Sequence, residues 1–247
     1  MSGHSKWSTI KRKKGAADAK RSKIFSRIVK EIQLAAREGG VDESNNPRLR
    51  LAILNAKGVN MPKDNIQRAI HKASSEGASL QEVTFEGYAP GGVAVFIECL
   101  TDNNNRTVSN IRSLFNKRGG NLGTNGSLSF LFDRKGVITI PKGTLNTEEF
   151  ELEVIDAGAE DIEEHEDVFV ITCSMEDFGR LRKKLEEMGI EAENASLQRI
   201  PNDLKKVPKE EGVRVLKYLE EFEEDDDVQN VYHNLEITDE MMEAMES

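Results

Sequence analysis

The stretch from residue 136 to residue 200 constrains the fold of this chain most strongly, because strand-like and helix-like patterns alternate along it. Apolar runs such as GVITI and DVFVITC are typical of buried strands, whereas TEEFELEVIDAG and EDFGRLRKKLEEMG have helical spacing. With AEDIEEH and IEAENASLQRI as further strands, the order is strand, helix, strand, strand, helix, strand. This βαββαβ order predicts a ferredoxin-like α+β domain.

The preceding stretch, from residue 80 to residue 132, predicts a second α+β domain that is incomplete by itself. VTFEGYAPGGVAVFIECLTD is typical of two strands separated by a Pro-Gly-Gly turn, NRTVSNIRSLFNKRGG of a helix, and SLSFLF of a strand. The tail offers one more helix, GVRVLKYLEEFEE, and one more strand, VQNVYHNLEI. We therefore expect the tail to complete the middle domain, also ferredoxin-like, with the third domain inserted between its two parts.

Three amphipathic helices are expected before these domains. The first begins at Asp18, buries a stripe of apolar side chains and ends at Gly39-Gly40. NNPRLRLAILNAKG predicts the second, with Pro47 in its first turn, and MPKDNIQRAIHKAS predicts the third. Short loops between such helices favour a small helical bundle. The expected domains are 1–78, a basic arm and helical domain; 79–133 plus 202–247, a discontinuous α+β domain; and 134–201, the inserted domain.

Charge is distributed very unevenly along the chain. The protein has a formal net charge of -10, yet its first thirty residues contain ten Lys and Arg and one acid, Asp18. Residues 1–75 carry a net charge of +11, and residues 76–247 carry -21. Such asymmetry favours a polyanionic partner for the N-terminal region, and nucleic acid is the obvious class.

Candidate nucleic-acid contacts follow from this charge distribution. A KRKK arm beside a cationic helix stripe can follow a phosphate backbone without distinguishing bases. Trp7 has two open interpretations, stacking on an exposed base or packing the arm against the helices. The candidate residues of this region are Lys6, Trp7, Lys11, Arg12, Lys13, Lys14, Lys20, Arg21, Lys23, Arg27 and Lys30.

A second candidate contact lies in LTDNNNRTVSNIR, where an Asn-rich loop leads from a strand into a helix. The first N–H groups of a helix form an anion site, and Arg106 adds positive charge there. Asn105 is a candidate cap or base contact. The alternative is a purely structural turn, with Asp102 or Asn105 capping the helix. The acidic run EEFEEDDD is interpreted as a solvated helix end.

Patterns typical of enzymes and cofactor sites are weak here. The four His are dispersed, GGNLGTNG lacks the GK[ST] of a phosphate loop, and no GxSxG is present. We expect no enzyme activity, no cofactor, no metal and no small-molecule substrate. The alternative from another class is a metal-dependent nuclease that uses carboxylates of the EDIEEHED segment: Glu163, Glu164, Glu166 or Asp167.

Compartment and membrane association are also indicated by the sequence. No run approaches the roughly 18 apolar residues of a membrane helix, and no apolar segment of a secretory signal follows the basic N-terminus. The two cysteines, Cys99 and Cys173, lie in apolar runs typical of buried reduced thiols. We therefore expect a cytoplasmic protein without a membrane partner.

Several long motifs resemble those of the YebC family, in order and over nearly the whole chain. They are GHSKWSTIKRKK, AREGG, NMPKDNIQRAI, FEGYAPGGVAVFIECLTDNNNRT, KRGGNLGTNGSLSFLFDRKG and DAGAED. The resemblance implies three domains, with the last inserted in the middle one, and a non-enzymatic regulator of gene expression. Asn104 is a departure, since many relatives have a basic residue there, and this weakens a phosphate role at that position.

The resemblance leaves two nucleic-acid partners open. It implies a DNA-binding transcriptional regulator for bacterial members, and translational activation for mitochondrial relatives. The expected function is therefore a DNA-binding transcriptional regulator, with a ribosome-associated, RNA-binding translation factor as the alternative. A protein adaptor whose basic region binds an acidic partner protein is a further alternative.

Overall fold

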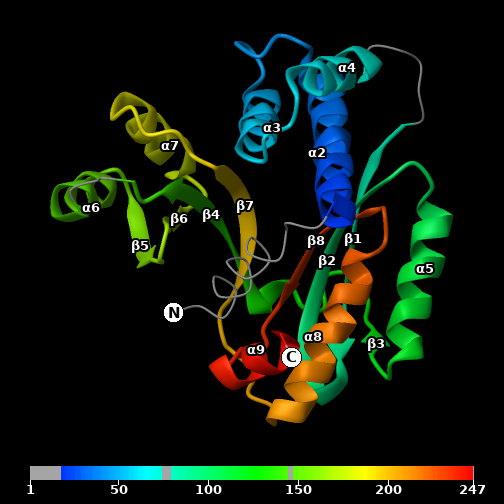
Figure 1. The fold of residues 1–247 in the computed structure, drawn as a ribbon. Coiled ribbons are helices and arrows are strands. Elements are labelled where there is room, and N and C mark those ends of the chain that lie inside the picture. The colour runs from blue at the N-terminus through cyan, green and yellow to red at the C-terminus, as the bar shows by residue number, and fades with distance from the viewer. Residues whose placement is uncertain (1–17, 74–78, 144–146, 247) are drawn as a thin grey trace. The chain divides into compact units, whose positions relative to one another are not determined.

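The computed structural model describes residues 18–73, 79–143 and 147–246, and Figure 1 shows the course of the chain. It is an α+β protein, with a three-helix N-terminal region followed by two four-stranded antiparallel sheets and their helices. The chain divides into two compact units, described separately below: residues 1–27, 78–133 and 200–247 form the first unit, and residues 28–77 and 134–199 form the second. The three-domain division expected above stays a prediction.

The sheet of the first unit has the strand order β3-β1-β2-β8. Strands β1 and β2 pair along their whole length and are joined by the Pro90–Gly92 turn that the sequence predicts. The last strand of the chain, β8, pairs with β2, so this sheet contains strands from both sides of residues 134–199. The strands are β1 (Gln81–Ala89), β2 (Val93–Thr101), β3 (Asn121–Leu122) and β8 (Val228–His233).

Helices α5 (Asn104–Lys117) and α8 (Lys209–Glu223) cover one face of this sheet. Alternate side chains of a strand point to the same face, so Val95, Ile97 and Cys99 of β2 share one core with residues of both helices. Phe115 of α5 and Phe222 of α8 are fully buried, with ring centroids 4.8 Å apart. A terminal helix, α9 (Asp239–Glu246), adds Met241 to this core and was not expected from the sequence.

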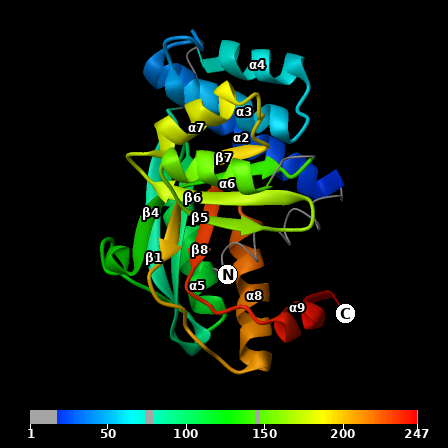
Figure 2. The same ribbon diagram turned by 90° about the vertical axis from the view of Figure 1, so that its left-hand side faces the viewer.

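The sheet of the second unit has the order β5-β6-β4-β7, and helices α6 (Thr147–Asp156) and α7 (Phe178–Glu187) lie on one of its faces (Figure 2). The helix and strand order expected from the sequence is confirmed for this stretch. Phe150 of α6 and Leu181 of α7 share a core with Phe169 of β6. The strands are β4 (Phe132–Pro141), β5 (Ala159–Glu164), β6 (Val168–Ser174) and β7 (Asn194–Pro201).

The three expected N-terminal helices are present as α2 (Asp18–Gly39), α3 (Pro47–Gly58) and α4 (Lys63–Ala73). Asn46 caps α3 by accepting a hydrogen bond from the Leu49 N–H, and its amide nitrogen donates to the Ala35 and Gly40 carbonyls. Helix α3 also contacts β7 within the second unit, where the Asn55 amide exchanges two hydrogen bonds with the Ala195 backbone, at 3.0 and 2.9 Å.

The expected strand SLSFLF is wrong, because residues 129–131 form a 3-10 turn and β4 begins only at Phe132. The buried Glu86 explains the difference. Its carboxylate accepts hydrogen bonds from the backbone N–H groups of Gly126 and Leu128, at 2.7 and 2.5 Å, and Leu128 then packs with Phe132. These local bonds replace the ladder that a strand would need. The two-residue edge strand β3 was also missed.

The space around two helical glycines, Gly58 and Gly179, predicts opposite effects on stability when each is replaced by alanine. A Cβ at Gly58 would lie 1.7 Å from the Glu193 carbonyl oxygen, whereas a Cβ at Gly179 in α7 would meet nothing within 4 Å. Gly58→Ala should therefore lower the free energy of unfolding by about 1–3 kcal/mol, the cost of overpacking. Gly179→Ala should raise it by up to about 1 kcal/mol, because alanine favours helix. Urea unfolding of both variants checks this, and equal effects would contradict the packing.

Candidate nucleic-acid interface

The arm residues expected to contact phosphates lie outside the described residues, and their roles stay predictions. They are Lys6, Trp7, Lys11, Arg12, Lys13 and Lys14. Lys20 belongs to the first turn of α2, but its side chain is likewise outside the described part. Arg21 is the first candidate whose side chain is described. It is exposed, and its guanidinium lies 5.4 Å from the centroid of the Phe25 ring.

The cationic stripe of α2 consists of Lys20, Lys23, Arg27 and Lys30, and two of these residues, Lys23 and Arg27, have partners within the first unit. The Lys23 ammonium donates to the Glu224 carbonyl and carboxylate, at 2.5 and 2.6 Å, and the Arg27 guanidinium donates to the Glu223 carbonyl at 2.6 Å. These acceptors belong to the end of α8, where carbonyl groups lack helical partners. Lys30 is half-buried and also has a partner. The stripe is therefore only partly available to an external ligand.

Burial and acidic neighbours act in opposite directions on Arg27. Burial lowers the pKa of its guanidinium, while Glu223, Glu224 and Asp226 act to raise it. The acidic run EEFEEDDD, expected to be only a solvated helix end, thus supplies acceptors for two cations of α2. The sequence alone could not show this pairing, because about 196 to 201 residues separate the partners.

The second candidate, Arg106, is held by a buried carboxylate. Asp227 has a side chain only 3% exposed and accepts hydrogen bonds from Arg106 Nη2 at 2.7 Å and from Thr107 Oγ1 at 2.9 Å. Arg106 Nη2 also donates to Asp102 at 2.9 Å. These hydrogen bonds, chiefly the one to Asp227, raise the pKa of the Arg106 guanidinium. Almost half of the Arg106 side chain remains exposed, so a phosphate role for it stays a prediction.

The start of α5 is capped by a residue that the sequence interpretation did not name. Asn103, rather than Asp102 or Asn105, accepts the hydrogen bond from the Arg106 N–H, at 3.1 Å, and Asp102 instead pairs with the Arg106 side chain. Asn105 is left exposed on the helix surface. The signal for the cap was present in the run of three asparagines, but the sequence could not distinguish among them.

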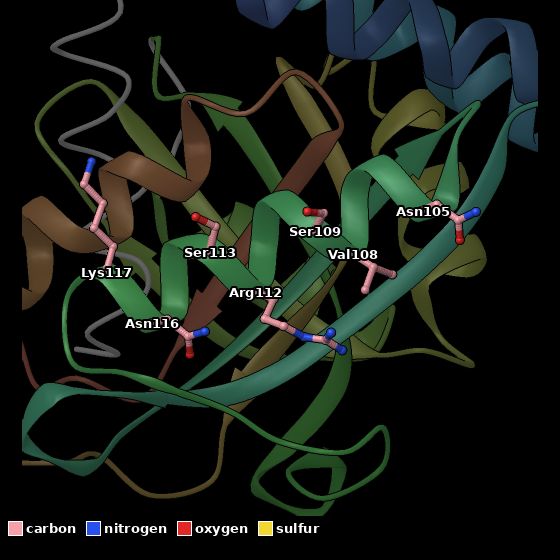
Figure 3. Close-up of a pocket in the computed structure, with 7 residues that line it drawn as sticks. All are labelled: Asn105, Val108, Ser109, Arg112, Ser113, Asn116 and Lys117. Atoms are coloured by element: carbon pink, nitrogen blue, oxygen red, sulfur yellow. The ribbon is translucent and has the colours of Figure 1, made fainter.

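Asn105 lines a shallow hollow of about 610 Å³ along the outer side of α5, shown in Figure 3. All of its lining residues come from this one helix: Asn105, Val108, Ser109, Arg112, Ser113, Asn116 and Lys117. Sequence analysis missed Arg112 and Lys117 as candidate contacts. The signal that would have revealed them is the absence of any acidic residue from α5.

The carboxylates proposed for a nuclease do not assemble a metal site. Glu163 lies 3.7 Å from His165, and Glu164 pairs with Lys142. Within residues 18–73, 79–143 and 147–246, no group of three or more His, Cys, Asp or Glu is placed to hold a metal ion. In the same part of the chain, no helix is both long and apolar enough to span a membrane.

Fold and charge together define an α+β protein whose cationic N-terminal region precedes an acidic body. Residues 5–76 match the family description "TACO1/YebC protein N-terminal domain", and residues 80–235 match "TACO1/YebC second and third domain". The chain belongs to the TACO1/YebC family.

Bacterial relatives match over nearly their whole length. A "Probable transcriptional regulatory protein" of Syntrophus aciditrophicus is 50% identical, with 99% of each chain covered. A protein of the same description from Thermotoga petrophila is also 50% identical, over 99% of this chain and 98% of its own. The crystal structure of a conserved hypothetical protein, Aq1575 from Aquifex aeolicus, matches with a TM-score of 0.82 at 44% identity, covering 90% of this chain and 93% of that one.

Two arginines on α5 should respond differently to the same substitution. Arg106→Gln removes the charged partner of the buried Asp227 and should lower the urea concentration at the midpoint of unfolding. Arg112→Gln, on the exposed side of the same helix, should leave that midpoint unchanged. Equal midpoints for the two variants would show that the Asp227 cluster does not stabilise the first unit.

Proposed function

We propose that this protein is a non-enzymatic regulator of gene expression that binds nucleic acid through its basic N-terminal region, with DNA as the target. The charge distribution carries the proposal: a region of +11 is joined to a body of -21. Phosphates attract Lys and Arg, and each contact releases condensed counterions. The full-length relatives are described as probable transcriptional regulatory proteins, which supports the same function.

The cations available for this role fall into two groups. The arm residues and Arg21 are proposed to bind phosphates directly, with Trp7 as a stacking candidate. Lys23 and Arg27 already donate to the end of α8, so a nucleic acid that uses them must displace Glu223 and Glu224. The proposed primary contacts are therefore the arm residues, and the stripe on α2 is secondary.

Folded RNA is the second candidate target, because a basic arm that neutralises phosphates does not itself distinguish DNA from RNA. On this alternative the protein is a ribosome-associated translation factor. Where the bound RNA is single-stranded, the expected salt dependence is less steep than for duplex DNA.

The proposed architecture assigns the remaining domains to positioning and protein contacts. We propose two ferredoxin-like domains, the second inserted in the first. The order β5-β6-β4-β7 and the pairing of β8 with β2 support this. Both cysteines are free and buried, which suits a protein of the reducing cytoplasm.

Binding to duplex DNA should depend steeply on salt. If the basic region neutralises six to eight phosphates, a plot of log affinity against log salt should have a slope of roughly -5 to -7. Fluorescence anisotropy with a labelled duplex, between 50 and 300 mM salt, measures it. A nearly flat dependence would contradict the proposal.

Replacing Lys11, Arg12, Lys13 and Lys14 by alanine should weaken binding to unrelated duplexes by similar factors, since backbone contacts carry no sequence information. The matched control removes four exposed cations of the acidic body: Lys205, Lys206, Lys209 and Lys217. Both variants lose the same charge, so a larger loss for the arm variant assigns the contact to the arm. If the arm variant loses binding to one sequence only, the proposed contact with the phosphate backbone is contradicted. If both variants lose the same affinity, the effect comes from net charge and not from a contact made by the arm.

A further inference from the structure

Helix α5 differs in composition from the other helices of the acidic body. Among helices α5 to α9, which the structure describes between residues 104 and 246, α5 alone contains no acidic residue. Its sequence, NNRTVSNIRSLFNK, instead combines cations with asparagine and serine. Residues 76–247 carry a net charge of -21, so a helix without acids is an exception that calls for a physical reason.

Packing on the inner side of α5 explains only the buried residues of this helix. Ile111 and Phe115 are fully buried against the sheet of the first unit, and the buried Thr107 donates a hydrogen bond to Asp227. The polar lining residues of the hollow remain exposed, on the turns between these positions (Figure 3). Because ordinary solubility is served equally well by Asp and Glu, which the neighbouring helices use, exposure alone does not explain their absence from α5.

The two cations of this surface are not used in the fold. Neither the Arg112 nor the Lys117 side chain makes a hydrogen bond or an ion pair with any residue in the described part of the chain. Two acids at the end of α8 are engaged by other residues of this region, since Asn110 donates to Asp225 at 3.0 Å and Arg118 pairs with Glu221 at 2.5 Å. Arg112 and Lys117 are therefore exposed and have no ion-pair partner among the described residues.

Every polar side chain in the hollow can donate hydrogen bonds, and none is anionic. Amide, hydroxyl, guanidinium and ammonium groups are those that contact phosphate oxygens in nucleic-acid complexes. The small Ser109 and Ser113 between the longer side chains leave the hollow of about 610 Å³, in which a phosphate can approach the helix. From Asn105 to Lys117 the surface extends about 18 Å, at 1.5 Å per residue.

We propose that the outer face of α5, defined by Asn105, Ser109, Arg112, Ser113, Asn116 and Lys117, is a second binding surface for the phosphodiester backbone of nucleic acid. The inference rests on the proposed function and adds to it a contact outside the basic N-terminal region. Charge complementarity favours nucleic acid as the ligand, because this face supplies hydrogen-bond donors and cations and the phosphodiester backbone supplies anionic acceptors.

The surface is held rigidly by the structure beneath it. Asn103 caps the first turn, and the Arg106 guanidinium links that turn to the buried Asp227. Phe115 anchors the last turn against Phe222. A rigid helix face loses little conformational entropy when it binds, which favours the use of short side chains such as serine and asparagine for contact.

The double substitution Arg112→Gln and Lys117→Gln tests this surface in the full-length protein. Loss of two phosphate contacts should make the log–log salt slope on labelled duplex DNA less steep by about 1.8, and lower the affinity at 0.1 M salt by roughly tenfold or more. The control is Lys209→Gln with Lys217→Gln on α8, which removes the same charge from two exposed cations of the same unit and should change neither value appreciably.

Failure of this inference can be told from failure of the proposed function. If the unsubstituted protein binds with a steep slope and the α5 pair matches the control pair, the surface on α5 is overturned while the role of the basic region stands. If the unsubstituted protein does not bind DNA or RNA, the proposed function fails first, and the surface on α5 fails with it.

Site-directed crosslinking gives a direct second measurement. The native Cys99 and Cys173 are buried, and burial raises the pKa of the Cys173 thiol to about 11, so Ser113→Cys introduces the single exposed thiol. A photoreactive maleimide at this position should crosslink to bound labelled duplex or single-stranded RNA, whereas the same label on Lys209→Cys should not. Equal crosslinking from both positions, or none from position 113, would overturn the surface on α5.

Discussion

The first unit depends on one buried carboxylate that connects segments far apart in the sequence. Asp227 precedes β8, Thr101 ends β2, and Arg106 and Thr107 begin α5, yet their side chains form one hydrogen-bonded cluster. The Asp227 carbonyl also accepts from the Leu100 N–H at 2.8 Å, which aligns the tail with the edge of β2. A charge taken out of water is tolerated only when it is paired and hydrogen-bonded, so the tail can complete this sheet only with α5 in place.

The same segment of the tail also bears on the proposed function. Glu223 and Glu224, just before Asp227, supply the acceptors that hold Lys23 and Arg27 of α2, so under the proposed function a phosphate backbone would have to displace them. On the proposed outer face of α5, Arg112 and Lys117 have no acidic side-chain partner among the described residues. An acidic protein can therefore bind a polyanion, provided that its free cations are gathered on surfaces from which acids are absent.

The sequence predicts local structure correctly where apolar periodicity is strong. It fails where a residue far away in the sequence determines the backbone conformation or the side-chain partner. The helices and strands between 134 and 201, and the three N-terminal helices, follow from apolar spacing and from signals such as Pro47 at the start of α3. The Pro90–Gly92 turn likewise predicts the pairing of β1 with β2. The turn at residues 129–131 was expected as a strand, because its dependence on the Glu86 carboxylate about forty residues away is invisible in the local pattern. The partners of Lys23, Arg27 and Arg106 likewise come from the tail, which spacing along the chain cannot pair with them.

The measurement that tests the central claim most directly is ultraviolet crosslinking in living cells, followed by sequencing of both the DNA and the RNA recovered with the purified protein. A variant with Lys11, Arg12, Lys13 and Lys14 replaced by alanine serves as the control. The account predicts that promoter DNA is enriched with the unsubstituted protein and depleted with the variant. Recovery of ribosomal RNA in place of promoter DNA would contradict the assignment to DNA, and recovery of neither nucleic acid above the variant's level would contradict nucleic-acid binding through the basic region.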